Sequence, residues 1–473
     1  MIASEQKNRY TRLSYIGFAL LMAILFEWFL WNRELGLGFL LFVLVYCIGF
    51  LTLVVATKQL HQHRALLLLI PIIILSFDVV IYNNTLVHSF TLLAILGLLV
   101  LFSILVPLKN PGKFSLSLLQ IPVVRNIFIF FQQWGKVYDD LFRGKTKEGK
   151  KNEMYKKIAI GIIVSIPILF VFVSLFAEAD PTFNNTVDSF SEWFSSLNIE
   201  EDTVGRMIRI FVLTLFGTSF LYIFLSEGHR MLGERVVTAW KIDNVISGTI
   251  LTLVNTLFLF FLIVQLETLQ NAEFAKSGFF QLTWVITLTA FMLIIFYRSV
   301  AYHGAGKFLK TLMIVSIVQV GLIASFALYR MNLFQDLGYS VLRLYVEWFI
   351  YFILTILLLA LVSIVLKKTF HFFFYTAAIL GIAAFTIVSS VNVDKMVGEE
   401  NFVRFVGGGS HIDYFRPLSV DAMEFLDAAA KGNFEQAETF KSLLEARYTS
   451  IQIHDSWQEW NFGIERARQY LSK

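Results

Sequence analysis

The sequence predicts an all-α fold: a polytopic transmembrane helical bundle of about eleven spans, followed by a small helical domain at the C-terminus. Of the 473 residues, 57% are hydrophobic and only 16% are charged, and the mean hydropathy is +0.67. A soluble domain carries about 25% charged residues. The apolar residues gather in runs of about 18 or more, long enough to cross roughly 30 Å of hydrocarbon as helix. The runs lack the two-residue alternation of a membrane barrel, so helices are the predicted spanning elements.

The predicted spans divide the membrane part into an N-terminal four-span segment, 1–108, and a seven-span core, 158–390. The first span follows basic residues, as a secretory signal does, but it contains Glu27 and meets no small-residue cleavage site, so we expect it to be retained. In chain order the eleven spans cover 13–31, 36–56, 65–82, 88–108, 158–177, 207–226, 245–266, 279–298, 311–329, 341–366 and 371–390.

Lysine and arginine occur mainly in alternate loops, which predicts the orientation of the spans. With the N-terminus in the cytoplasm, the inner loops carry the basic residues and the outer loops are poor in them. An odd number of spans then places the C-terminus outside the cytoplasm. The basic residues of the predicted inner loops are Lys58, Arg64, Arg230, Arg235, Lys241, Arg298, Lys307, Lys310, Lys367 and Lys368.

The longest inner loop, 109–157, combines an amphipathic stretch with a polybasic one. Apolar residues recur at helical spacing between Leu119 and Leu141, so this stretch is predicted to lie along the membrane interface. The lysines that follow are predicted to contact anionic lipid headgroups, either as an ordinary positive-inside signal or as a regulatory lipid contact. These are Lys145, Lys147, Lys150 and Lys151.

Residues 391–473 lose the hydrophobic runs and become rich in charge, which predicts an extracytoplasmic helical domain. Ser419 is predicted to cap a first helix ending at Ala430, and a second amphipathic helix is predicted over 434–447. Asp455 and Gln458 have the spacing of a capping box for a third helix ending near residue 471. This domain is the predicted contact surface for a protein partner in the cell envelope.

Charged and polar residues concentrate at the predicted outer ends of the spans, which suggests a polar, water-accessible chamber on that side. Interfacial snorkelling and structural ion pairs between helices would place charges at the same level. Two deeper side chains, Asn255 and Gln319, are expected to form hydrogen bonds between helices. The candidate outer polar cluster comprises Glu178, Asp180, Lys276, Asp336, Arg343, Glu347, Asn392 and Asp394.

The sequence lacks the motifs that are typical of disulfide, metal and catalytic sites. The single cysteine, Cys47, cannot form an internal disulfide and is expected to be a small core side chain. His61 and His63 are two residues apart, which on a helix turns them to nearly opposite faces. No HExxH, CxxC, GxSxG or phosphate-loop motif occurs. The sequence therefore predicts no metal, cofactor or nucleic-acid partner, and it identifies no catalytic residue.

A series of short strings from about 170 to 470 forms an ordered set. The strings are Ala179-Asp180-Pro181 with Phe183, Phe274 to Leu282, Gly338, Leu342-Arg343-Leu344-Tyr345, Asn392, Asp394, Asn401, Leu418-Ser419, Asp421-Ala422, Trp457, Trp460-Asn461 and Arg466-Ala467-Arg468. Together they resemble a family of bacterial polytopic membrane proteins known as domain of unknown function 4153, and its relative 4173. Glu178 and Val393 depart from the pattern, where a small residue and a proline are expected. The resemblance implies a bacterial inner-membrane protein and brings no activity.

Three functions are consistent with this reading. The first is an envelope sensing, signal-transmitting or scaffolding component that uses residues 391–473 as its contact surface. An alternative is a transporter or lipid flippase that uses the outward polar chamber, although no internal repeat is evident. A second alternative is a membrane-embedded enzyme on a lipid-linked substrate, with Asp180 or Glu178 as general base and Lys276 or Arg343 holding an anionic group.

Overall fold

The structure is a computed structural model. It describes residues 2–108, 201–222, 225, 242–268, 279–304, 306–335, 338–408, 412–432, 434–451 and 456–471. Several predicted features lie outside the described residues: the loop 109–157 with Lys145, Lys147, Lys150 and Lys151, the span 158–177, and the candidate residues Glu178, Asp180, Lys276 and Asp336.

The described part of the chain is helical, and nine of its helices are long and apolar enough to cross a membrane. Nine of the eleven predicted spans coincide with them, which confirms a polytopic membrane protein in contact with lipid. The first predicted span falls in α1 (Ile2–Phe29), whose apolar part is Leu13–Phe29. The nine coinciding spans lie in α2 (Leu37–Ala56), α3 (Leu69–Ile81, preceded by a 3₁₀ turn at His63–Leu68), α4 (Thr85–Leu105), α9 (Glu201–Tyr222), α11 (Asn244–Thr268), α13 (Phe279–His303), α14 (Lys307–Gln335), α15 (Val341–Val365) and α16 (Phe370–Ser389).

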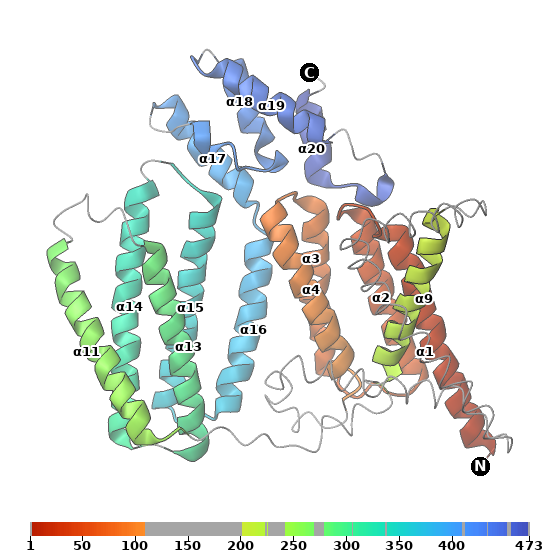
Figure 1. Cartoon of the computed structure of the whole chain (residues 1–473), viewed down its shortest axis with the longest axis horizontal. Coiled ribbons are helices and arrows are strands. Elements are labelled where there is room, and N and C mark those ends of the chain that lie inside the picture. Colours follow the sequence, from red (N-terminus) through yellow and green to blue (C-terminus); the bar gives the residue numbers. More distant parts are fainter. Residues whose placement is uncertain are drawn as a thin grey trace, which may run out of the picture. The chain divides into compact units, whose positions relative to one another are not determined.

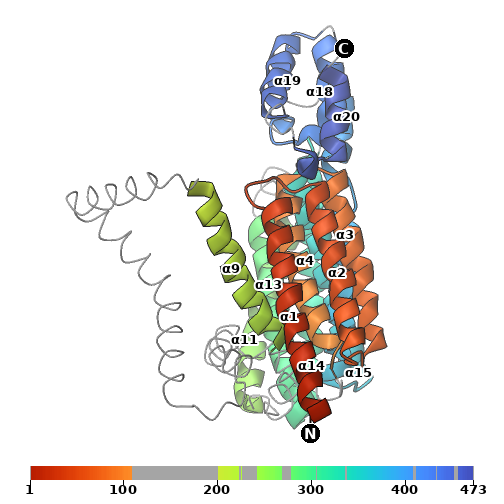
Figure 2. The same cartoon turned by 90° about the vertical axis from the view of Figure 1, so that its right-hand side faces the viewer.

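The chain divides into two compact units, and the first comprises Met1–Asn32, Leu44–His63 and Ser103–Glu234. In this unit α1 pairs with α9 (Figure 2). The helices approach closely at Gly217, where an added Cβ would lie 3.2 Å from the Cβ of Ala19. Glu27 of α1 is only 6% exposed, and Arg209 of α9 donates to it from Nε at 3.0 Å. The charge in the first span is therefore neutralised by a partner helix.

The second unit comprises Arg33–Val43, Arg64–Phe102 and Arg235–Lys473. Within it, α11 packs on α14 through a polar cluster around Asn255. The Asn255 Nδ2 donates to the Leu312 carbonyl at 3.0 Å, and its Oδ1 accepts from Ser316 at 2.6 Å. Gln319 donates to the Asn255 carbonyl at 3.0 Å. The predicted hydrogen bonds of Asn255 and Gln319 between helices are thus confirmed.

The last part of the second unit is a group of four helices that we call the C-terminal cap (Figure 1, blue). It consists of α17 (Val393–Val406), α18 (Met423–Lys431), α19 (Ala437–Ile451) and α20 (Phe462–Leu471). Short 3₁₀ turns lie at Ile412–Tyr414, Val420–Ala422 and Trp457–Glu459. The helix α17 was not predicted. Ser419 does cap the turn that leads into α18, accepting from the Asp421 N–H.

Asp455 lies outside the described residues, and Gln458 does not have the role in a capping box that was predicted for it. Gln458 lies in a 3₁₀ turn, and α20 begins only at Phe462. The capping side chain is Asn461, whose Oδ1 accepts from the N–H groups of Gly463 at 2.8 Å and Ile464 at 3.2 Å. Asparagine is among the residues preferred at the N-cap.

The apolar core of the cap is continuous with the first turns of α15. Val341 and Leu344 of α15 belong to the same buried cluster as Val393, Leu418 and Met423 of the cap. Aromatic rings complete this core: Phe415 and Phe440 meet edge to face at 5.3 Å, and Phe405 packs on both. The cap is therefore built on the end of a membrane-spanning helix and shares its core.

Candidate functional site

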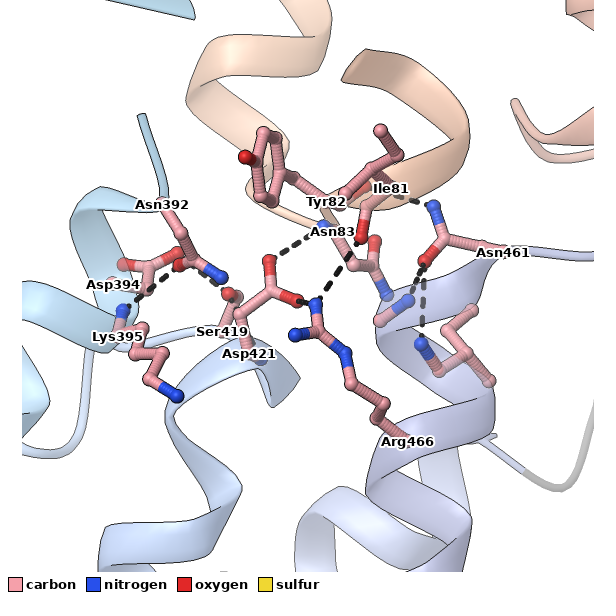
Figure 3. A network of polar contacts seen from close by, with 12 residues as sticks. Ile81, Tyr82, Asn83, Asn392, Asp394, Lys395, Ser419, Asp421, Asn461 and Arg466 are labelled. Atoms are coloured by element: carbon pink, nitrogen blue, oxygen red, sulfur yellow. Dashed lines mark hydrogen bonds and ion pairs between the residues drawn. The ribbon is translucent and has the colours of Figure 1, made fainter. Parts of the chain in front are cut away.

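The C-terminal cap meets the end of α3 and the start of α4 through a buried network of polar side chains, which is the candidate functional site (Figure 3). The two helices are joined by the short connection Tyr82–Asn83–Asn84. At Tyr82 the backbone becomes extended, with φ −111° and ψ 156°, so α3 ends there. The turn consequently presents its asparagines and the last carbonyl groups of α3 to the cap.

Asp394, in the first turn of α17, makes the first connection. Asn392 caps this helix by accepting from the Lys395 N–H at 2.9 Å, which fixes the position of Asp394. The Asp394 carboxylate is 2% exposed, and its Oδ2 accepts from Asn84 Nδ2 at 2.7 Å and from Ser419 Oγ at 2.5 Å. Burial raises the pKa of this carboxyl above its usual range, and the two side-chain hydrogen bonds oppose that shift.

Asp421 makes the second connection, from the turn that precedes α18. Its Oδ2 accepts from the backbone N–H of Asn83 at 2.7 Å. Its Oδ1 faces Arg466 of α20 at 3.7 Å, and the side chain is only 1% exposed. The pKa of Asp421 is raised to about 6 in all: burial raises it most, the Asn83 hydrogen bond lowers it, and the neighbouring Asp394 carboxylate raises it.

Asn461 makes the third connection and satisfies two helix ends at once. While its Oδ1 caps α20, its Nδ2 donates to the carbonyls of Val79 and Tyr82, both at 2.8 Å. The side chain is 2% exposed. The last carbonyls of a helix have no partner within it, so this amide supplies donors that the end of α3 needs.

A separate connection joins the cap to the segment that leads into α15. The fully buried Asn401 of α17 accepts from the Tyr339 N–H at 2.7 Å and donates to the Tyr339 carbonyl at 2.9 Å. Just before it, Gly338 has φ +137°, and a Cβ there would lie 2.7 Å from the ring of Tyr414. Glycine is therefore required both by the backbone angle and by the closeness of the ring.

Two further connections reach the start of α2 and the end of α16. Arg33 donates to Gln458 at 3.0 Å, and the Leu37 N–H donates to the Trp460 carbonyl at 3.0 Å. At the end of α16, Ser390 Oγ donates to Asp78 of α3 at 2.7 Å. The connections predicted to share one side of the membrane thus meet at one end of this unit, which we call the capped end.

In the structure, the described members of the predicted outer cluster make different contacts. Asn392 and Asp394 lie in the network. Arg343 donates to the Gly338 carbonyl at 3.4 Å, and Glu347 accepts from the Tyr351 hydroxyl at 3.4 Å on the same helix. The described residues show polar groups used to join helices, and the predicted chamber as a whole stays a prediction.

Sequence reasoning assigned no role in this network to Asn84, Asp421 or Asn461. A signal was available for two of them, Asp421 and Asn461, because they belong, with Asn401, Ser419 and Arg466, to the strings that carry the family resemblance. Those strings are far apart in the chain. In the structure Asn401, Asp421, Asn461 and Arg466 contact the membrane helices or the segments next to them, and Ser419 donates to Asp394, which makes such a contact.

The network is suited to holding helices together. Its carboxylates accept from backbone and side-chain donors, and in the part of the chain that the structure describes no group of three or more His, Cys, Asp or Glu could hold a metal ion. The only buried oxygen atom of these two aspartates without a hydrogen bond among the described residues is Asp421 Oδ1, which faces the Arg466 guanidinium. A residue set of this kind fixes geometry and responds to protonation.

The fold and this site define a polytopic α-helical membrane protein whose C-terminal helices are joined to the ends of its spans. Comparison with known proteins gives the family: residues 65–429 match the domain of unknown function DUF4153, and the chain belongs to that family. No curated protein and no solved structure matches the chain.

Proposed function

We propose that this chain is a sensing, signal-transmitting or scaffolding component of the bacterial cytoplasmic membrane, with its N-terminus in the cytoplasm and the C-terminal cap outside. One observation supports the proposal most strongly: hydrogen bonds of the buried side chains Asp394, Asp421 and Asn461 join the cap to the end of α3 and to the α3–α4 turn. A domain on a loose tether could bind a partner without effect on the spans. A cap attached in this way transmits any displacement to α3 and α4.

The contact surface that we propose for a protein partner is the exposed face of α17. Met396, Val403 and Val406 are 43%, 64% and 55% exposed, and their spacing of seven and three residues places them on one face of the helix. Exposed apolar side chains grouped beyond the ends of the spans are a feature of interaction sites. This face gives the proposed envelope partner of residues 391–473 a specific location.

The transporter or lipid flippase and the membrane-embedded enzyme remain the alternatives. Both depend on a reactive or substrate-binding role for the outer polar cluster. Two of its described members have structural contacts instead: Asn392 caps α17, and Asp394 accepts hydrogen bonds from Asn84 and Ser419. This use of the two residues favours the sensing or scaffolding proposal.

The proposal is tested by a photo-crosslinking amino acid placed at Val403 in the full chain in its native membrane. We expect a defined envelope protein to be captured there, and its capture to be lost in Met396→Glu, which adds a charge to the same face. The matched control position is Lys441, on the exposed surface of α19, from which that protein should not be captured. Capture of the same proteins from both positions, or of none, would contradict the proposal.

The proposed orientation has its own test, because it rests on the basic residues of alternate loops. A reporter fused after Lys473 should be active outside the cytoplasm. Activity only in the cytoplasm would reverse the orientation and remove the cap from the compartment in which the proposed partner lies.

A further inference from the structure

The segment between α19 and α20 buries its amide side chains and exposes its aromatic ones. Gln458 and Asn461 are only 4% and 2% exposed. Trp457, Trp460 and Phe462 alternate with them in the chain and are 48%, 41% and 46% exposed. We call these three rings the aromatic face. A segment surrounded by water turns its amides outward and its rings inward, so the aromatic face is expected to lie against a less polar medium.

The backbone of this segment lies directly on the ends of two membrane-spanning helices. Asn461 donates to two carbonyls at the end of α3, both at 2.8 Å (Figure 3). The neighbouring Trp460 carbonyl accepts from the N–H of Leu37, the first residue of α2, at 3.0 Å. The contact is close, because a Cβ added to Gly36 would lie 2.6 Å from the carbonyl carbon of Glu459. The segment is therefore held at the level at which these spans end.

The lengths of the two spans set the depth of that level in the bilayer. The span in α2, Leu37–Ala56, has 20 residues. At ~1.5 Å per residue it is ~30 Å long, which is just the thickness of the hydrocarbon core. Because α2 has no spare turn beyond the hydrocarbon, Leu37 lies at the boundary between the acyl chains and the headgroups, and Trp460 lies beside it. The span that ends in α3, His63–Ile81, has 19 residues and gives the same depth for Asn461.

The side chains of the aromatic face suit this boundary. A tryptophan ring combines a large apolar body with one N–H donor, and such rings are enriched where the hydrocarbon meets the headgroups. The rings of Trp460 and Phe462 meet edge to face, with 6.3 Å between their centroids. The Arg466 guanidinium lies over the Phe462 ring at 5.0 Å, and the arginine side chain is 39% exposed. A cation next to apolar rings is also typical of the layer in which lipid phosphates lie.

We propose that the aromatic face inserts into the interfacial layer of the adjacent leaflet, at the level of the lipid ester groups, and anchors the base of the cap to the bilayer. The partner of this surface is glycerophospholipid, recognised by the polarity of the layer and by no particular headgroup. The anchor is separate from the proposed partner surface on α17, and it operates in the same way whichever compartment the cap occupies.

The first test uses the unaltered full chain in vesicles of phosphatidylethanolamine and phosphatidylglycerol. A small fraction of the phosphatidylethanolamine carries a photoreactive group, either next to the ester or at the methyl end of the acyl chain. Residues 457–462 should be crosslinked by the first probe and several times less by the second, and the surface around Lys441 of α19 by neither. The proposal is overturned if neither probe crosslinks 457–462 while the spans are crosslinked, or if the chain-end probe crosslinks the segment as much as the other.

A second test measures the surroundings of one position directly. A nitroxide is attached at Phe462→Cys in the full chain with Cys47→Ala, since Cys47 is the only cysteine of the sequence. Lys441→Cys is the matched control, because the Lys441 side chain is 57% exposed on α19. Oxygen concentrates in lipid and a nickel chelate stays in water, so the ratio of oxygen to nickel collisions should be several times higher at 462 than at 441.

Two results of this measurement would contradict the anchor. The same ratio at both positions would place residue 462 in water. Few collisions with either reagent at 462 would place it against protein, in a preparation that contains this chain alone.

Discussion

The attachment of the cap should weaken as pH rises, because Asp421, at the centre of the network, is buried and its pKa is raised. Its pKa in the folded protein is about 6, against an ordinary value of 3.8. A carboxyl whose pKa is raised on folding binds more protons in the folded state, so its contribution to stability is largest at low pH and is lost as pH rises through the folded pKa. Asp394 is shifted in the same direction and adds to the effect.

The magnitude follows from the shift. Taken over the whole titration, roughly two pKa units at ~1.4 kcal/mol each give about 3 kcal/mol. Between pH 5 and pH 7.5 the same two pKa values give about 1.4 kcal/mol, or a roughly tenfold increase in the population with an open cap. Asp421→Asn removes the charge and retains an acceptor for the Asn83 N–H, so it should flatten most of this dependence.

Amide hydrogen exchange of the full chain measures this opening. The reporter is the α3–α4 turn, since the Asn83 N–H is itself the donor to Asp421. Protection of this turn, corrected for the intrinsic pH dependence of exchange, should be greater at pH 5 than at pH 7.5. The reasoning is refuted if the opening free energy is unchanged or rises with pH, or if Asp421→Asn shows the slope of the unaltered chain.

Two substitutions test the connections that do not titrate. Asn461→Ala removes the cap of α20 and the donors to the end of α3, and should lower the free energy of cap opening by about 2–3 kcal/mol, while the exposed Lys441→Ala should change it by less than ~0.5 kcal/mol. Gly338→Ala should lower the free energy of unfolding by about 1–3 kcal/mol because of its backbone angle alone, and the clash with the Tyr414 ring should lower it further. The control, Gly321→Ala, lies in a helix with open space around it and should be neutral or stabilising in thermal unfolding.

The spans could be predicted from the sequence because their cause is local. Each must present about 20 apolar residues to lipid and satisfy its own backbone, so hydropathy alone locates them. The cap at Ser419, on the 3₁₀ turn that leads into α18, was also predictable, because the Ser419 hydroxyl accepts from an N–H only two residues further along the chain.

The connections of the cap could not be predicted, because they depend on contacts over long sequence separations. Asn83 and Asp421 are 338 residues apart, and nothing local distinguishes an asparagine in a solvated turn from one that donates to a buried carboxylate. The capping box at Gln458 failed for a related reason: its side chain is 4% exposed and accepts from Arg33, near the other end of the chain. The helix α17 could not be predicted because it is rich in charged residues, and its apolar residues form a buried face only where they pack on the cap core.

The most direct test of the account is a double-mutant cycle between Asn84 and Asp394, the side chains that join the α3–α4 turn to α17 at 2.7 Å. Asn84→Ala, Asp394→Ala and the double variant are compared by the free energy of cap opening from hydrogen exchange. A hydrogen bond to a buried carboxylate predicts a coupling energy of about 1.5–3 kcal/mol. Effects that add to within ~0.5 kcal/mol would show that the cap is not held to the membrane helices by this network.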